Sequence, residues 1–231
     1  AHRLGHGGVA YTQPVRIEAD MHADLARLSP LAPLHLPYEL EAIDAVEAQQ
    51  PGLIHIACFD TAFHTTQPRL ARLFGLPRRY ADQGVLRYGF HGLSYAFIAS
   101  HLPSLLPESR ARGRVVVAHL GNGASVCGMR AQQSVATSMG FSALDGLVMG
   151  TRCGRLDPGA LLYLLEHEGL SVPALGEMLS RQSGLLGVSG ISHDVRTLEA
   201  DGRPEAEEAL ALFAYRTAAE IGQLTMALGG L

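Results

Sequence analysis

Five loops of this sequence carry arginine, histidine, asparagine or aspartate, the residue types that bind anions or move protons, and four of the five also contain glycine. Loops that carry such side chains are better candidates for function than the elements they connect. The five are HRLGHGG at 2–8, FDTAFHTTQP at 59–68, RYGFHGLSY at 87–95, HLGNGAS at 119–125 and MGTRCGRLDPG at 149–159. Two or three arginines placed among them would be enough to bind a small anionic ligand.

The first two loops each have a chemical interpretation and a structural alternative. Arg3 offers a planar guanidinium that suits a carboxylate or a phosphate, although a surface ion pair explains it equally well. His2 and His6 could form a metal pair only on a helix, and the neighbouring glycines argue against a helix. Asp60 follows a buried apolar run, where a carboxylate could hold magnesium or accept a proton, or simply cap a turn. We expect His64 to be a packing or hinge residue.

The remaining loops suit the binding of negatively charged oxygens. His91 lies between Gly89 and Gly92, so its imidazole is open to donate to an oxyanion, and a structural or solvated histidine is the alternative. The turn at 121–123 can expose backbone N–H groups to phosphate oxygens, but Asn-Gly is also an ordinary hairpin turn. Arg152 fits the role of an arginine that binds a phosphoryl group better than the role of a surface residue.

Hydrophobic periodicity places these loops at the ends of strands and helices. Apolar spacing predicts helices at 39–49, 93–106, 158–168 and 204–228. The run LIHIACF predicts a buried strand that ends at Asp60, and the runs VVVAHL, ASVCGM and SVATS predict a β-hairpin meander. Asp157 is expected to cap the helix that starts at Pro158. His91 would then lie on a turn at the entrance of a helix.

Composition predicts an ordinary globular protein of 231 residues, as one large domain or two small ones. Hydrophobic residues make up 47% and charged residues 17% of the chain, below the average of roughly 25%. The net charge is −4 and no basic run occurs, which argues against nucleic acid or a membrane as the partner. No apolar stretch approaches the roughly 20 residues that span a bilayer.

The three cysteines, Cys58, Cys127 and Cys153, form no C-x-x-C pair. Neither a disulfide framework nor a zinc site is therefore expected, and a reducing cytoplasm is the predicted location. A hydrolase is the weaker alternative to an anion-binding enzyme, because the sequence has no G-x-S-x-G and no H-E-x-x-H.

Together the motifs resemble the acetate kinase family, which includes acetate and propionate kinases. The resemblance runs from Arg3 to about Glu199, in the family order, through HRLGHGG, LAPLH, FDTAFHTTQP, RYGFHG, VVVAHLGNGASV, MGFSALDGLVMGTR and GVSGISHDVR. It implies a two-lobed α/β fold of the sugar kinase, Hsp70 and actin type (ribonuclease H-like), incomplete in this chain. Residues 1–64 would be the remaining part of the first lobe, and 65–231 most of the second, through which the family dimerises.

The same resemblance implies a reversible, ATP-dependent phosphorylation of a short-chain carboxylate, such as acetate or propionate, with Mg²⁺ or Mn²⁺. The products would be an acyl phosphate and ADP. Donors placed around the three equatorial oxygens of the transferring group would lower the barrier more than covalent chemistry. A catalytically inactive, nucleotide-binding relative of the same superfamily is the alternative.

The family motifs assign roles to residues of this chain. Asp60 matches the catalytic aspartate near the metal, and His91 and Arg152 match the pair that stabilises the transferring phosphoryl group. Arg3 matches the arginine that holds the substrate carboxylate, and His35 a supporting histidine. The other substrate-binding positions are Gly5, Leu34, Phe90 and Ala143. The nucleotide-binding positions are His119, Asn122, Gly123, Asp194 and Arg196, and no metal ligand is assigned within this chain.

Departures from the family pattern lead to further expectations. Gly5 stands where valine is usual and Ala143 where proline is usual, which predicts a roomier acyl pocket that accepts propionate or butyrate. Arg155 replaces an acidic residue, and the sequence offers no explanation for that change. The family's first phosphate loop and its last adenosine loop have no counterpart here, so we expect a fragment that is inactive by itself, with unpaired strand edges.

Overall fold

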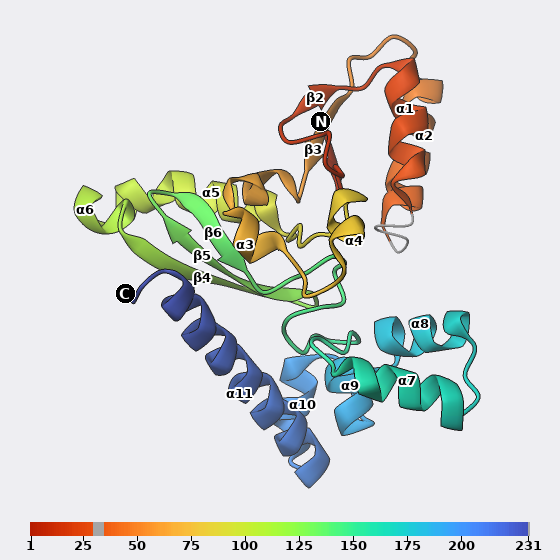
Figure 1. Ribbon diagram of the computed structural model, residues 1–231, viewed down its shortest axis with the longest axis vertical. Helices are drawn as coiled ribbons and strands as arrows, with labels where there is room; N and C mark the ends of the chain where they lie inside the picture. The colour runs from red at the N-terminus through yellow and green to blue at the C-terminus, as the bar shows by residue number, and fades with distance from the viewer. Residues whose placement is uncertain (30–34, 231) are drawn as a thin grey trace.

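The computed structural model describes residues 1–29 and 35–230, which form two sheets with helices packed on them (Figure 1). The first sheet contains β1 (His2–Leu4), β2 (Val15–Arg16) and β3 (Ile56–Phe59), in the order β1-β3-β2. β1 runs parallel to β3, and β2 runs antiparallel to it. The division of the chain at about residue 64 stays a prediction.

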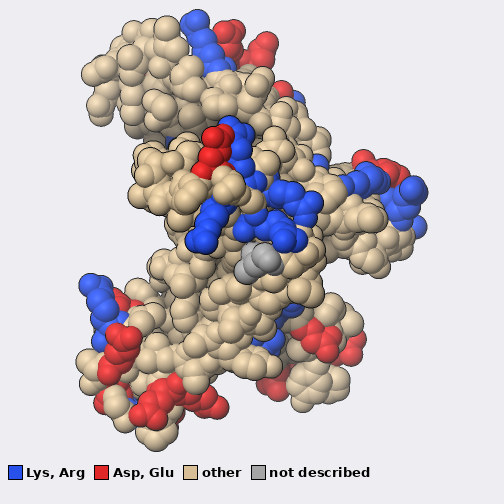
Figure 2. All heavy atoms as spheres, turned by 90° about the vertical axis from the view of Figure 1, so that its left-hand side faces the viewer, with Lys and Arg blue, Asp and Glu red and all other residues tan. Residues whose placement is uncertain are grey.

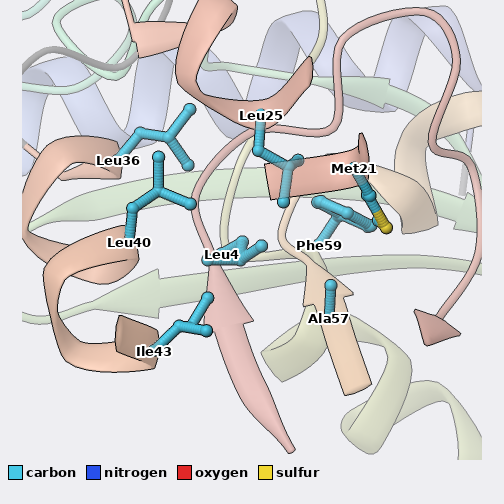
Figure 3. Packing of buried hydrophobic residues seen from close by; sticks show 8 residues of the cluster. All are labelled: Leu4, Met21, Leu25, Leu36, Leu40, Ile43, Ala57 and Phe59. Carbon is cyan, nitrogen blue, oxygen red and sulfur yellow. The ribbon is translucent and has the colours of Figure 1, made fainter. Parts of the chain in front are cut away.

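Helices α1 (Ala19–Arg27) and α2 (Leu36–Gln49) cover the first sheet and bury its apolar side chains (Figure 3). Leu36, Leu40 and Ile43 recur along one side of α2, and each is buried. They meet Leu4 and Phe59, the last residues of β1 and β3. Each such side chain contributes about 1.5–3 kcal/mol to stability when fully buried. This core therefore holds the ends of the two parallel strands against α2.

Two predicted boundaries in this part differ from the structure. The helix expected at 39–49 begins earlier, at Leu36, because Pro37 fits the first turn of a helix. The strand expected over 53–59 covers only Ile56–Phe59. Leu53 and Ile54 are 48% and 59% exposed, so the prediction that the whole run is buried was wrong. The strand ends immediately before Asp60, as predicted.

The second sheet confirms the predicted meander. It contains β4 (Arg114–Leu120), β5 (Ala124–Arg130) and β6 (Gln133–Thr137), all antiparallel in the order β4-β5-β6. His119 faces Ser125 across β4 and β5, directly before the turn at 121–123. This register places the turn at one end of the sheet, with a histidine and a serine beside it.

Helices α5 (Gly92–Leu105) and α11 (Pro204–Ala227) pack on opposite faces of this sheet (Figure 1). Side chains of a strand alternate between faces, and Cys127 packs with α5 while Val126 packs with Leu224 of α11. Both helices were predicted to within one residue at each end. The predicted helix after Asp157 is α7 (Pro158–His167), and the Asp157 side chain accepts from the Gly159 N–H at 2.8 Å.

The remaining elements are short helices in the connections. They are η2 (Ala62–Thr66), α3 (Arg69–Arg72), α4 (Arg78–Asp82), α6 (Glu108–Ala111), α8 (Val172–Arg181), α9 (Gly184–Ser189) and α10 (Val195–Asp201). Among the residues that the structure describes, no helix combines the length and the apolar character needed to cross a membrane.

Basic side chains gather in the middle of one face of the molecule (Figure 2). This face carries α6 and the C-terminal end of α11 (Figure 1). Arg114 and Arg130 donate to the carbonyls of Gly229 and Leu228, just beyond α11. Cationic donors at a helix C-terminus satisfy carbonyls that have no partner within the helix, so these arginines attach α11 to the sheet.

Candidate active site

Arg3 and Asp60 form an ion pair at the end of the first sheet. Parallel pairing of β1 with β3 brings them together, and the Asp60 N–H donates to the Leu4 carbonyl at 2.9 Å. Arg3 donates through Nε to both carboxylate oxygens at 3.2 Å and through Nη2 to Oδ2 at 2.6 Å. The Asp60 side chain is 3% exposed and that of Arg3 is 60% exposed. The hydrogen bonds from Arg3 to Asp60 raise the pKa of Arg3, which keeps this guanidinium cationic.

The loop that carries His91 approaches Asp60 closely because it contains glycines. The Gly92 N–H donates to the Asp60 carbonyl at 2.9 Å, and a Cβ on Gly92 would lie 2.0 Å from that oxygen. Gly89 has a φ of +78°, and a Cβ there would lie 2.6 Å from the ring of His64. His91 itself has a φ of +58°, an uncommon conformation for a non-glycine residue. The loop is therefore held in one unusual shape by its neighbours.

His64 confirms the expectation of a packing residue. It is 1% exposed, its Nε2 lies 2.9 Å from the Phe90 carbonyl, and its Nδ1 lies 2.8 Å from the Ser134 hydroxyl. Burial lowers its pKa to about 4, so the ring is neutral at pH 7 and Nε2–H donates to the carbonyl. His64 thus anchors the backbone beside His91 to the second sheet.

Two histidines stack beside the turn at 121–123. The ring centroids of His91 and His119 are 4.1 Å apart, with an interplanar angle of 18°. The Nδ1 atoms meet serine hydroxyls: Ser125 at 2.8 Å from His91 and Ser94 at 3.1 Å from His119. Burial, followed by the nearby His119, lowers the pKa of His91 to about 3, and burial also lowers the pKa of His119. Both rings therefore act as polar, uncharged groups at neutral pH.

Arg152 approaches the same turn from the loop before α7. Its Nη1 donates to the Ala143 carbonyl at 2.9 Å. A Cβ on Gly123 would lie 2.3 Å from Nη2 of Arg152 and 3.3 Å from Nε2 of His91, so a side chain at this position would displace the Arg152 guanidinium. Burial lowers the pKa of Arg152, but a guanidinium stays protonated in proteins. A partly buried cation and a neutral imidazole thus converge on the turn.

A cavity of about 480 Å³ joins these groups. It is lined by Arg3, Gly5, His35, Asp60, Phe90, His91, Leu93, Ser94, His119, Gly121, Asn122, Gly123, Ala143 and Arg152. Within the described part of the chain, it contains every predicted site residue except Asp194 and Arg196. Leu34, predicted at the substrate, lies outside the described residues. Leu93, Ser94 and Gly121 were not named as site residues, although all three lie within the candidate loops at 87–95 and 119–125.

Asp194 and Arg196 lie apart from this cavity. They form an exposed ion pair at 2.6 Å and line a separate surface hollow with Thr197, Ala200 and Asp201. Asp194 also accepts from the Arg196 N–H at 2.9 Å, which caps α10. The side-chain bond from Arg196 lowers the pKa of Asp194 to about 2. The structure therefore does not bring this pair together with the other predicted residues, and its place beside the adenosine stays a prediction.

The part of the cavity beside His35 has room for a methyl group at Gly5. A Cβ added to Gly5 would lie 3.5 Å from Cβ of His35 and 3.7 Å from the carboxylate of Glu39, which are ordinary contacts. Glu39 accepts from the Gly5 N–H at 2.8 Å, and burial raises its pKa. The pattern of α2 gave no sign of this role, because Glu39 occupies an unremarkable position in the first helical turn. Burial, followed by Arg152, lowers the pKa of His35.

Arg155 binds α11 and does not line the cavity. Its guanidinium lies 3.0 Å from Glu220 Oε2 and donates to Gln223 at 3.0 Å. Glu220 is 5% exposed, so the arginine compensates for a buried carboxylate. This contact explains a residue for which the sequence offered no explanation.

The residues of the cavity do not form a metal centre by themselves. Among the described residues there is no group of three or more His, Cys, Asp or Glu side chains that could hold a metal ion. Asp60 already accepts three hydrogen bonds from Arg3. His2 lies 2.7 Å from His55, so it does not pair with His6. A protein-built site for Mg²⁺ or Mn²⁺ therefore does not fit this part of the chain.

Comparison with known proteins identifies the family of the chain. The family model described as the acetokinase family matches residues 1–231. The chain is 54% identical over 230 residues to an acetate kinase of Rhodopseudomonas palustris (strain TIE-1), and it covers 58% of that relative. It is 47% identical to an acetate kinase of Rickettsia felis, of which it covers 60%. The chain thus spans about 58% of the length of the curated relatives it matches.

Solved structures agree with this result. The structure of Porphyromonas gingivalis acetate kinase matches with a TM-score of 0.90 and 37% identity, over 100% of this chain and 59% of that one. A propionate kinase from Francisella tularensis matches with a TM-score of 0.93 and 36% identity, over 97% of this chain and 59% of that one. These matches confirm the predicted two-lobed, actin-like α/β fold, which is incomplete in this chain. The chain belongs to the acetokinase family.

Proposed function

We propose that this chain carries most of the active site of a kinase that transfers a phosphoryl group reversibly between ATP and a short-chain carboxylate such as acetate. The convergence of Arg3, Asp60, His91 and Arg152 in one cavity is the observation that carries the proposal. Membership of the acetokinase family and similarity to proteins named acetate kinase and propionate kinase support it.

The carboxylate substrate would bind at the Arg3 end of the cavity. The guanidinium is cationic and well exposed, and its Nη1 has no hydrogen-bond partner among the described residues. A carboxylate accepts from such a group in a charge-assisted bond, which also fixes the direction of its attacking oxygen. The acyl tail would then lie toward Phe90 and Ala143, with the space at Gly5 beside it.

Phosphoryl transfer would take place between Arg3 and the turn at 121–123. A carboxylate oxygen forms the new bond to the γ-phosphorus while the bond to the β-phosphate oxygen breaks and ADP leaves. Negative charge spreads over the three equatorial oxygens in this process. Arg152 supplies a partly buried positive charge and His91 a neutral N–H donor near these oxygens, and both are preorganised by their contacts with the protein.

The nucleotide would bind on the side of His119, Asn122 and Gly123. Backbone N–H groups of a glycine-containing turn suit phosphate oxygens. Mg²⁺ or Mn²⁺ would enter with the nucleotide and would supply positive charge against its phosphates. The pair of Asp194 and Arg196 would contact the adenosine only from the outer rim. A cytoplasmic homodimer is the assembly that the family resemblance predicts.

Trapping of the acyl phosphate tests this proposal. The chain itself and a family-length version, made by adding the flanking segments of the R. palustris relative, are incubated with ATP, Mg²⁺, acetate and hydroxylamine. We expect hydroxamate from the family-length protein and far less from the chain alone. Arg152→Ala should abolish the signal, while Arg181→Ala, an exposed position outside the cavity, should keep it. ATP hydrolysis without hydroxamate would contradict the proposal.

A further inference from the structure

A buried chain of hydrogen bonds leads from the second sheet to His91. The Tyr95 hydroxyl lies 2.6 Å from the Ser125 hydroxyl, which lies 2.8 Å from Nδ1 of His91. Tyr95 comes from α5 and Ser125 from β5, and both side chains are 0% exposed. Water therefore does not compete for these groups.

The polar hydrogen atoms of Tyr95, Ser125 and His91 can be arranged in only one way that gives each hydroxyl hydrogen an acceptor. Tyr95, Ser125 and a neutral imidazole each carry one polar hydrogen. If His91 Nδ1–H donated to Ser125, either the serine or the tyrosine hydrogen would lack an acceptor among the described residues. A buried hydroxyl without an acceptor costs about 1–3 kcal/mol. In the satisfied arrangement Tyr95 donates to Ser125, Ser125 donates to Nδ1, and the imidazole hydrogen is on Nε2.

We propose that Tyr95 and Ser125 are positioning residues that hold His91 in the Nε2–H tautomer, with this N–H directed at the phosphate-binding side of the cavity. The role in phosphoryl transfer rests on the proposed function, whereas the tautomer does not. A Cβ on Gly123 would lie only 3.3 Å from Nε2, which shows that this nitrogen faces the turn at 121–123. The opposite tautomer would present a lone pair to phosphate oxygens and repel them.

The environment of His91 also requires the ring to be neutral. His119 is stacked on it at 4.1 Å, and Arg152 and Arg3 add positive charge nearby. Burial is the main reason that the pKa of His91 falls to about 3. A ring that stays neutral can donate from only one nitrogen, so the tautomer decides whether the cavity faces a donor or an acceptor. Two hydroxyls outside the cavity thereby determine what His91 offers to the ligand.

Nitrogen-15 NMR of the histidine-labelled protein tests the tautomer directly. The family-length protein is used, and His91 is assigned by comparison with His91→Gln. We expect a protonated-type shift at Nε2 and an unprotonated-type shift at Nδ1 at pH 7. His64 is an internal reference, because its Nε2–H donates to a carbonyl independently of Ser125. A protonated Nδ1 on His91 in the unsubstituted protein would overturn the proposal.

Two variants test the roles of the hydroxyls. Ser125→Ala and Tyr95→Phe should move the His91 nitrogen shifts toward an average of the two tautomers, while His64 keeps its shifts. Ser180→Ala removes a buried serine hydroxyl of α8 that does not line the cavity; it is the matched control and should leave the nitrogen shifts of both His91 and His64 unchanged. Unchanged His91 shifts in both variants would overturn the proposal.

Kinetics separate a positioning role from simple loss of structure. In Ser125→Ala we expect kcat to fall about tenfold or more with KM for acetate nearly unchanged, because a misplaced tautomer of a catalytic histidine affects the transition state. If the family-length protein shows the expected tautomer but makes no acyl phosphate, the proposed function fails and the tautomer assignment stands. An unchanged kcat in Ser125→Ala would refute the link to catalysis.

Discussion

Asp60 and Gly92 are joined by a main-chain hydrogen bond of 2.9 Å, which links the end of the first sheet to the start of α5. The carboxylate of the same aspartate holds Arg3, so one residue connects the Arg3 side of the cavity to the loop that carries His91. The cavity depends on this contact because its two sides come from segments far apart in the sequence.

Gly92→Ala should therefore damage both folding and activity. The added Cβ would lie 2.0 Å from the Asp60 carbonyl, so backbone must move, and we expect destabilisation of about 1–3 kcal/mol or more. Gly176→Ala is the matched control: its Cβ would meet nothing within 4 Å in α8, and alanine should stabilise that helix by about 0.5–1 kcal/mol. Urea unfolding measures both, and equal stability of the two variants would contradict the assigned contact.

The space at Gly5 predicts a change in substrate preference. Gly5→Ala should fold normally, because its Cβ would make contacts of 3.5 Å and longer. It should reduce kcat/KM for propionate and butyrate relative to acetate by roughly fourfold per methylene, the equivalent of about 0.8 kcal/mol. The ratio of kcat/KM values for the three acids is the measurement. A ratio equal to that of the unsubstituted protein, or a steep preference for acetate before substitution, would refute the roomier pocket.

Arg152→Ala should lower kcat far more than it changes KM for the carboxylate. Arg152 faces the turn at 121–123, whereas the proposed carboxylate site is at Arg3, so we expect the loss of Arg152 to remove transition-state stabilisation. We expect a decrease of about 10²–10³ in kcat. Arg181→Ala, on the outside of α8, is the control. A rise in KM with kcat preserved would place Arg152 in substrate binding instead.

Stability should decrease as the solution becomes acidic, because buried histidines must remain neutral in the folded chain. Burial lowers the pKa of His64 and of His6 to about 4, from 6.5 in the unfolded chain. Below pH 6.5 the unfolded chain binds protons that the folded chain does not, so unfolding becomes more favourable as the pH falls toward 4. For His64 alone the loss is about 3 kcal/mol by pH 4.

Urea unfolding at several values between pH 7.5 and pH 4.5 checks this effect. His64→Asn should lose stability at pH 7.5 but show a weaker dependence on pH than the unsubstituted protein. His101→Gln, at an exposed position, should keep the original dependence. A dependence in His64→Asn that matches the unsubstituted protein would contradict the assigned burial effect.

Local sequence patterns predicted the elements well where one physical signal dominated. The short β-rich runs on either side of Asn122 predicted the meander, and helical spacing predicted α5 and α11. The strand predicted over 53–59 was too long because Leu53 and Ile54 are apolar yet exposed. Hydrophobicity alone does not distinguish an apolar residue in a buried strand from one in an exposed loop. The start of α2 was placed too late because proline interrupts a helix except in the first turn, where Pro37 lies.

The cavity residues were predicted from motifs, whereas their supporting contacts were not. In the sequence, Ser125 and Tyr95 have the pattern of ordinary strand and helix residues. Only the packing of α5 on β5 brings the Ser125 hydroxyl to His91 and the Tyr95 hydroxyl to Ser125. Glu39 likewise becomes significant only when α2 packs beside Gly5. Such contacts depend on long-range geometry that a single sequence does not encode locally. Asp194 and Arg196 show the opposite case, since their motif is present but they lie outside the main cavity.

Phosphorus-31 NMR with ¹⁸O-labelled acetate tests the central claim most directly. The family-length protein is incubated with ATP, Mg²⁺ and the labelled acid, and the product is observed without trapping. Direct attack by the carboxylate predicts an acyl phosphate resonance that carries the isotope shift of an ¹⁸O bonded to phosphorus. ADP with unlabelled inorganic phosphate as the only products, or no consumption of ATP, would contradict the account.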